Sequence, residues 1–304
     1  MNHLDEKDIS YEIITNCQLD EVEQRPNSYL DLLEEKFTED ELALAPRSFD
    51  TIGDIVVIEI TDELWDKKQL IGEAILEAHS SISTVFAKAG KIRGVKRIRP
   101  IEFIAGDKKT KTIYKEYGVR YVVDIAEAYF SPRLSEEHTR ISEKVSDEEI
   151  IVDMFCGVGP FVIPIAKKTN SKCYAIDINP QAIALLKENI QLNKLKGEII
   201  PFIGDCRKVV QEEQLENIAD RVIMNLPGYA IDFIDVACQV LKKDGGIIHF
   251  FEFVGGDEPE QTIIDDLTRE VEKANRTVEK VLEVRRVRMS APRQWQMVID
   301  AVIK

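Results

Sequence analysis

The sequence predicts an α/β protein with a mixed seven-stranded sheet in a larger C-terminal domain, preceded by a smaller α+β domain. From residue 148 onward, short apolar runs alternate with amphipathic helical stretches, a rhythm typical of a parallel sheet covered by helices on both faces. Two further runs near the C-terminus, separated by Ala291-Pro292, predict a hairpin that adds antiparallel strands. Before residue 126, several strand-like runs accompany a single helix, which favours a separate mixed sheet.

The N-terminal part divides into two segments. Residues 1–47 hold thirteen acidic and four basic side chains, so we expect a small acidic appendage or mobile arm with one helix near residues 29–37. Residues 48–127 are expected to form the α+β domain, with a helix that Thr61 caps and that runs to about His79. The strands expected there are 54–60, 84–89, 97–104, 111–117 and 119–125.

The larger domain is expected to span residues 128–304. Five apolar runs predict its parallel strands: 150–154, 172–176, 198–203, 221–224 and 246–251. Helical patterns between them include 180–194 and 229–242. The terminal runs, 278–287 and 295–303, predict the antiparallel hairpin.

Composition excludes several classes of protein. The 304 residues contain no apolar run of the roughly 18–20 residues that a membrane span needs, and the N-terminus lacks the layout of a signal peptide. The five cysteines and four histidines show none of the usual metal-ligand spacings. We therefore expect a cytoplasmic protein with no metal site and no membrane contact.

The distribution of charge is more informative than the net charge of −15. Residues 88–115 hold ten basic side chains against two acidic ones, Glu102 and Asp107. Nucleic-acid binding depends on a local excess of lysine and arginine that contacts phosphates. This segment is therefore the candidate phosphate-binding surface, although the chain as a whole is acidic.

A glycine turn after the first parallel strand predicts a nucleoside site. The strand ends at Asp153, the turn contains Gly157 and Gly159, and Pro160 suits the first position of a helix. A dinucleotide-binding loop requires a small third residue at the position of Val162. This departure and the acidic strand end favour S-adenosylmethionine over NAD, although a lone G-x-G is also found in structural turns.

The ends of the next strands carry further polar groups. Asp177 follows Asp153 by 24 positions, close to the spacing at which a carboxylate accepts hydrogen bonds from ribose hydroxyls; the alternative is a role at the helix terminus alone. Asp205, before Cys206, is placed to accept from an adenine amino group. At the fourth strand end, Asn225-Leu-Pro227 would aim an amide at a planar nucleobase edge, or form an ordinary turn.

A segment before the larger domain places charges about one helical turn apart. Within Tyr129-Phe-Ser-Pro-Arg-Leu-Ser-Glu-Glu-His-Thr-Arg140, Arg133, Glu137 and Arg140 are expected on one helix face. Such a face is either a salt-bridged surface or a charged cluster over the site.

Together these motifs resemble the archaeal and eukaryal tRNA guanine-N1 methyltransferase family that acts at position 37. The resemblance runs from about residue 49 to the C-terminus, and its most specific parts are residues 101–106, 129–134, 153–161 and 225–227. It implies a Rossmann-like class I methyltransferase domain that binds S-adenosylmethionine, together with a smaller domain that contacts tRNA. It also implies that residues 1–47 are a reduced form of the family's N-terminal domain.

The resemblance also implies roles for individual residues. Glu137 matches the general base, Arg97 the arginine that stabilises charge on guanine O6, Tyr129 a residue that shapes the base pocket, and Asn225 an amide that orients the base. Arg93 and Arg99 are rivals of Arg97. The candidate cofactor-binding residues, from the resemblance and the motifs, are Arg133, His138, Asp153, Gly157, Asp177, Ile178, Asp205, Cys206, Asn225 and Pro227.

The implied chemistry is consistent with these residue types. Guanine N1 carries a proton at neutral pH, so a carboxylate must remove it before methylation, and a guanidinium stabilises the charge that then develops on O6. The expected partner is the anticodon stem-loop of tRNA, and the expected state is a monomer. Alternatives are methylation of another RNA base nitrogen, a non-catalytic RNA-binding protein with the same fold and, more weakly, a dehydrogenase.

Overall fold

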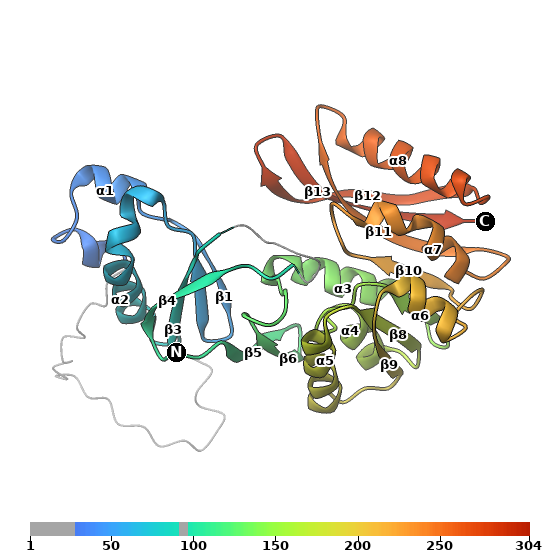
Figure 1. Cartoon of the computed structure of the whole chain (residues 1–304), viewed down its shortest axis with the longest axis horizontal. Coiled ribbons are helices and arrows are strands. Elements are labelled where there is room, and N and C mark those ends of the chain that lie inside the picture. The colour runs from blue at the N-terminus through green and yellow to red at the C-terminus, as the bar shows by residue number, and fades with distance from the viewer. Residues whose placement is uncertain (1–27, 91–96) are drawn as a thin grey trace, which may run out of the picture.

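The computed structural model describes residues 28–90 and 97–304. Figure 1 shows two parts, a smaller N-terminal domain in blue to teal and a larger C-terminal domain in green to red, with the hairpin β5–β6 between them. The expectations for residues 1–27 and for Arg93 lie outside the described residues.

The larger domain contains the predicted mixed seven-stranded sheet. Its strand order is β12-β13-β11-β10-β7-β8-β9, with β7 to β11 parallel and β13 antiparallel to both of its neighbours, β11 and β12. All five parallel strands and the terminal hairpin are therefore confirmed. The strands are β7 (Ile150–Asp153), β8 (Lys172–Asp177), β9 (Glu198–Ile203), β10 (Arg221–Met224), β11 (Gly246–Gly255), β12 (Val278–Ala291) and β13 (Gln294–Ile303).

Helices cover both faces of this sheet. Since neighbouring residues of each strand point to opposite sides, they pack against different helices. Ile151 packs with α3, α4 and α5 on one face, whereas Val152 packs with α6, α7 and α8 on the other. The helices are α3 (Ser135–Lys144), α4 (Val162–Lys168), α5 (Pro180–Leu192), α6 (Cys206–Glu212), α7 (Ile234–Val240) and α8 (Pro259–Lys273).

Two helix starts differ from the sequence prediction. Pro160 lies in the turn before α4, which begins at Val162, because the glycine turn continues through Phe161. The stretch predicted as one helix over 229–242 is a 3-10 turn, Ala230–Phe233, followed by α7. Both differences lengthen the loops at the carboxyl edge of the sheet.

The smaller domain has a four-stranded sheet with one long helix packed against it. The strand order is β1-β2-β3-β4, and only β2 and β3 are parallel. β1 was not predicted from the sequence, whereas the other three strands were. The elements are α1 (Glu39–Leu44), β1 (Phe49–Ile52), β2 (Ile55–Ile58), α2 (Lys68–Ala78), β3 (Thr84–Lys88) and β4 (Ile101–Gly106), with 3-10 turns at Asp31–Leu33 and Asp62–Lys67.

Residues 29–45 belong to the core of this domain. Tyr29, Leu33 and Phe37 are buried in one cluster with Ile71 and Ile75 of α2. This differs from the expected appendage. Acidic residues lie between the apolar ones in this segment, so its average hydropathy is low. That average did not indicate that the apolar residues are spaced to enter a core.

The hairpin of β5 (Lys111–Glu116) and β6 (Val119–Asp124) forms a two-stranded sheet of its own. It was expected in the mixed sheet of the smaller domain, but Tyr121 of β6 packs in the core of the larger domain. The backbone groups on the free edge of β6 form hydrogen bonds with two asparagine side chains, one from α5 and one from the residue that follows it. Asn189 exchanges hydrogen bonds with both backbone groups of Val122, at 2.6 and 3.1 Å, and Asn193 does the same with Arg120 at 3.1 and 2.7 Å.

Within residues 28–90 and 97–304, no helix is both long enough and apolar enough to cross a lipid bilayer.

Replacing Asn189 by alanine should destabilise the fold, because its amide also donates to the carbonyl of Val158 at 3.1 Å and three buried or partly buried backbone groups would lose their partner. We expect a loss of roughly 1–3 kcal/mol in the free energy of unfolding, measured in urea. Gln191→Ala, on the exposed face of the same helix, is the matched control and should change it by less than about 0.5 kcal/mol. Equal effects of the two substitutions would contradict this account of the β6 edge.

Candidate functional site

A cleft of about 890 Å³, counting space open to solvent, lies at the carboxyl ends of β7, β8, β9 and β10. Strand ends of a parallel sheet are the usual position of ligand sites in such folds. Most of the predicted site residues line it. They are Arg97, Tyr129, Gly157, Asp177, Ile178, Asp205, Cys206, Asn225 and Pro227.

The glycine turn and Asp177 form one hydrogen-bonded unit in this cleft. Gly157 and Gly159 have φ of +52° and +90°, a region that favours glycine. A Cβ on Gly159 would lie 2.5 Å from a methyl carbon of Leu186. The amide of Gly157 donates to Asp177 at 2.8 Å, and the amide of Asn179 donates to the other carboxylate oxygen at 2.8 Å. Burial raises the pKa of Asp177.

The opposite wall of the cleft combines a helix start with aromatic rings. Asp205 caps α6 by accepting from the amide of Arg207 at 2.9 Å. Burial raises the pKa of the neighbouring Cys206 thiol to about 12, so this side chain is uncharged and contributes packing. The rings of Phe155 and Phe233 meet edge to face at 5.1 Å, and the guanidinium of Arg207 lies 3.6 Å from the centre of the Phe233 ring.

The third side of the cleft brings together residues that are far apart in sequence. Arg97 donates to the carbonyl oxygen of Pro227 at 2.8 Å and lies 5.6 Å from the ring centre of Tyr129. Burial lowers the pKa of Arg97. The side-chain oxygen of Asn225 is buried and, within the described residues, has no hydrogen-bond partner. An unpaired acceptor of this kind in a cleft is available to a ligand donor.

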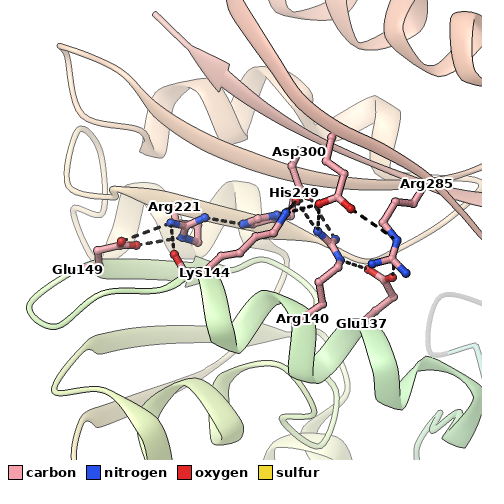
Figure 2. Close-up of polar contacts among 9 residues, drawn as sticks. Glu137, Arg140, Lys144, Glu149, Arg221, His249, Arg285 and Asp300 are labelled. Carbon is pink, nitrogen blue, oxygen red and sulfur yellow. Dashed lines mark hydrogen bonds and ion pairs between the residues drawn. The ribbon is translucent and has the colours of Figure 1, made fainter.

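Glu137 does not line the cleft. It is 2% exposed, and its carboxylate accepts from Arg140 at 2.7 Å and lies 3.6 Å from the guanidinium of Arg285. Figure 2 shows both side chains pointing from α3 toward the sheet, where Arg140 also contacts Asp300. Glu137 is thus salt-bridged but buried, which differs from the salt-bridged surface that the sequence offered as an alternative.

Three predicted cofactor contacts also lie outside the residues that line the cleft. Arg133 pairs with Asp50 of the smaller domain at 2.6 Å. His138 is buried and contacts Glu116 of the hairpin at 2.8 Å. Asp153 is fully buried below the glycine turn, where one oxygen accepts from the amide of Phe155 at 3.2 Å. Their roles at the cofactor stay predictions.

Several cleft residues were not predicted as site residues. Phe253, Arg288 and Gln296 come from β11 and the terminal hairpin, and Arg288 donates to Gln296 at 2.7 Å. The predicted strands ended at residues 251 and 287, whereas β11 and β12 extend to Gly255 and Ala291. The alternation of apolar and polar residues continues past residues 251 and 287, and this pattern could have predicted the longer strands. Phe155 lay within the glycine motif, but it was not assigned a role.

The basic segment 88–115 does not form one continuous cationic surface in the described residues. Lys109 pairs with Asp54 at 2.5 Å and Lys111 with Glu188 at 2.8 Å, so carboxylates of the protein neutralise them. A groove beside the cleft instead collects basic side chains from both domains. Lys88, Arg97, Arg99, Arg133 and Arg288 line this groove, together with Asp50 and Glu59.

The buried Asp153 predicts a pH dependence of stability. Burial, with a contribution from the charge of Asp177, raises the pKa of Asp153 to about 8. A carboxyl whose pKa is higher in the folded state than the ordinary 3.8 favours folding at low pH, and this contribution is lost as the pH rises through about 8.

Asp153→Asn removes this titration. Its advantage in free energy of unfolding over the wild type should therefore grow between pH 5 and pH 8.5, by on the order of 1–4 kcal/mol. Urea unfolding at several pH values measures it, with the exposed Asp244→Asn as control. A difference independent of pH would contradict the buried neutral carboxyl.

Comparison with known proteins agrees with this geometry. Residues 112–301 match the TRM5/TYW2 methyltransferase domain, and residues 29–110 match the TYW2 N-terminal domain. The chain is 40% identical over 287 residues to tRNA (guanine(37)-N(1))-methyltransferase Trm5b of Pyrococcus abyssi, covering 94% of this chain and 83% of that protein. It is 36% identical to tRNA 4-demethylwyosine(37)-methyltransferase Taw21 of Saccharolobus solfataricus, covering 71% and 82%.

Solved structures extend the likeness. The complex of aTrm5 and tRNALeu has a TM-score of 0.80 and 38% identity, covering 97% of this chain and 84% of that one. Methanocaldococcus jannaschii TYW2 in complex with AdoMet has a TM-score of 0.66 and 31% identity, covering 84% and 99%. With a strand order and cleft of this kind, the chain is an S-adenosylmethionine-dependent enzyme of the class I methyltransferase fold, and it belongs to the TRM5/TYW2 methyltransferase family.

Proposed function

We propose that the protein transfers a methyl group from S-adenosylmethionine to N1 of guanosine 37 in tRNA. One observation carries the proposal: the carboxylates at the ends of β8 and β9 share a single cleft with Arg97, Tyr129 and Asn225. A nucleoside cofactor and a nucleobase thus have separate walls of the same space. The likeness to Trm5b supports the position and the atom methylated.

The residues of the cofactor side fit S-adenosylmethionine. The bare backbone at Gly157 admits close approach, Asp177 offers oxygen acceptors to ribose hydroxyls, and Asp205 offers one to an adenine amino group. Phe155 and Phe233 supply apolar surface for a ring. When bound, the cofactor supplies an electrophilic methyl group on a sulfonium.

The residues on the other side fit a guanine. Arg97 is a buried guanidinium that would stabilise negative charge on O6, and the unpaired amide oxygen of Asn225 would accept from a base N–H. Tyr129 would stack on or confine the ring. The base must leave its stack to reach this cleft, at a cost of a few kcal/mol.

Glu137 is proposed as the acceptor of the N1 proton. It contacts Arg285, which pairs with Val298 on β13, while Gln296, two residues along the same strand, lines the cleft. Two residues of a strand span about 7 Å. Glu137 is therefore linked to the cleft wall through Arg285 and β13, and the role requires its carboxylate to leave Arg140 and Arg285 when RNA binds.

The groove beside the cleft is proposed to hold the phosphates of the anticodon loop. Five basic side chains line it against two acidic ones, and it shares Arg97, Tyr129 and Arg288 with the cleft. The RNA backbone could thus continue from a base held in the cleft. The likeness to the tRNALeu complex supports RNA as the partner.

A second substrate is supported by the likeness to Taw21. At 36% identity, a tricyclic 4-demethylwyosine at position 37 is a candidate beside guanosine. Assaying tRNA that carries each nucleoside separates the two.

The proposed function makes a testable claim about the target nucleoside. A tRNA transcript with guanosine at position 37 should accept radiolabelled methyl groups, and nucleoside digestion should release 1-methylguanosine. The same transcript with adenosine at position 37 should stay at background, because adenine offers no protonated N1 and no O6. Equal labelling of the two transcripts, or a different methylated nucleoside, would refute the proposal.

The proposed function also makes a testable claim about removal of the guanine N1 proton. Glu137→Gln should slow methyl transfer in a single turnover by about 10²- to 10⁴-fold, the usual contribution of a general base. Cofactor affinity, measured by calorimetry, should stay within about twofold of the wild-type value. Glu136→Gln, an exposed neighbour on α3, is the matched control and should remain active. A folded Glu137→Gln protein with full activity would exclude Glu137 as the base.

A further inference from the structure

Glu252 is a buried carboxylate on β11 that sits beneath the loop Asn225–Gly228. It is 6% exposed, and its neighbours Phe250 and Val254 on the same face of the strand belong to an apolar core. One carboxylate oxygen accepts from the amides of Gly228 and of Phe253, the latter at 2.7 Å. The other oxygen is buried and has no hydrogen-bond partner within the described residues. A carboxylate in this position is costly unless its contacts compensate.

Glu252 and Arg97 bind the same peptide group, the one that joins Pro227 to Gly228. The carbonyl of Pro227 and the amide N–H of Gly228 belong to the same peptide, and in a trans peptide they point in opposite directions. Arg97 donates to the carbonyl at 2.8 Å, and Glu252 accepts from the N–H. A cation and an anion therefore hold the two ends of one peptide dipole.

This arrangement fixes more than the loop. Each charge strengthens the other contact, because hydrogen bonds to ionised groups are strong and polarise the peptide between them. Burial lowers the pKa of Arg97, and the charge of Glu252 opposes this change. Burial raises the pKa of Glu252, and the charge of Arg97 opposes that change. Gly228 has φ of +88°, so the peptide is also turned by backbone that favours glycine. Asn225, three residues earlier in this loop, lines the cleft, and its buried side-chain oxygen has no partner within the described residues.

We propose that Glu252 is a positioning residue for methyl transfer: through the Pro227–Gly228 peptide it sets the orientation of Arg97 and of the Asn225 loop. The inference rests on the proposed function only in that Arg97 and Asn225 meet the target base. Glu252 itself touches neither base nor cofactor. A carboxylate is required because only a charged acceptor both holds the amide and attracts the guanidinium.

Glu252→Gln tests the charge, since glutamine keeps a carbonyl oxygen for the two amides and loses the attraction to Arg97. We expect the rate at saturating tRNA to fall by about tenfold or more, equivalent to about 1.4 kcal/mol, with cofactor affinity within about twofold. Glu258→Gln, an exposed glutamate after the same strand, is the control and should match the wild type.

A double-mutant cycle separates positioning from simple structural support. If Glu252 acts through Arg97, Glu252→Gln should slow an Arg97→Ala protein by less than about twofold. A purely structural role would give the same fold-change in both backgrounds, together with a proportionate fall in melting temperature. That result would overturn the inference, as would full activity of a folded Glu252→Gln protein.

A readout independent of activity distinguishes this inference from the proposed function. In protein labelled with ¹⁵N-glycine, the Gly228 amide proton should resonate downfield and move upfield in both Glu252→Gln and Arg97→Ala. An unchanged Gly228 resonance in both variants would overturn the inference. An inactive wild type with these shifts would instead count against guanosine 37 as the substrate.

Discussion

A string of buried charges holds α3 against the larger sheet, and the position of the candidate base depends on it. Asp300 of β13 is 1% exposed and accepts from Arg140 of α3 and from His249 of β11. His249 in turn contacts Arg221 of β10, which pairs with Glu149 (Figure 2). Burial alone would raise the pKa of Asp300, but the hydrogen bonds from His249 and Arg140 hold it well below its usual range. Removal of one partner from such a set leaves an uncompensated buried charge, which is strongly destabilising.

This string sets the distance between α3 and the cleft. Arg140 binds Glu137 of its own helix and Asp300 of β13, so a tilt of the helix would disturb the contact with Asp300. Asp300 and Gln296 lie on the same face of β13, four residues apart, and Gln296 lines the cleft. The strand thus spaces the anchored helix from the cleft. In the role proposed for Glu137, its own side chain would have to move, because Arg140 is also bound to Asp300.

The sequence was sufficient where chemistry follows from neighbouring residues. The turn at Gly157 and the carboxylate of Asp177 were predicted together because each lies at a strand end, and parallel strand ends meet at one edge. Asp205 and Asn225 followed from the same rule. The five parallel strands were equally accessible, since continuous apolar runs between helices have few other structural solutions.

The sequence was insufficient where a role depends on register or on a distant partner. In the sequence, Glu252 is one polar residue at the end of an apolar strand. Only its hydrogen bond with the 225–228 loop suggests a role for it. Arg133 was predicted as a cofactor contact, which stays a prediction; its ion pair with Asp50, more than eighty residues earlier, could not be foreseen from the neighbouring sequence. Lys109 and Lys111 contributed to a local excess of charge whose partners, Asp54 and Glu188, lie outside the segment.

The two halves of the cleft consequently have different origins. The cofactor half is built by consecutive strand ends of one sheet, and each of its groups is fixed by contacts within a few residues or with the next strand. The other half needs three separate pieces: Arg97, the 225–228 loop and the terminal hairpin that carries Arg288. Arg97 precedes β4 of the smaller domain, and Arg133 ties the larger domain to β1 through Asp50. Loosening the contact between the domains would therefore disturb the base half first. The half proposed to hold the cofactor would persist, because its own hydrogen bonds lie within the larger sheet and its loops.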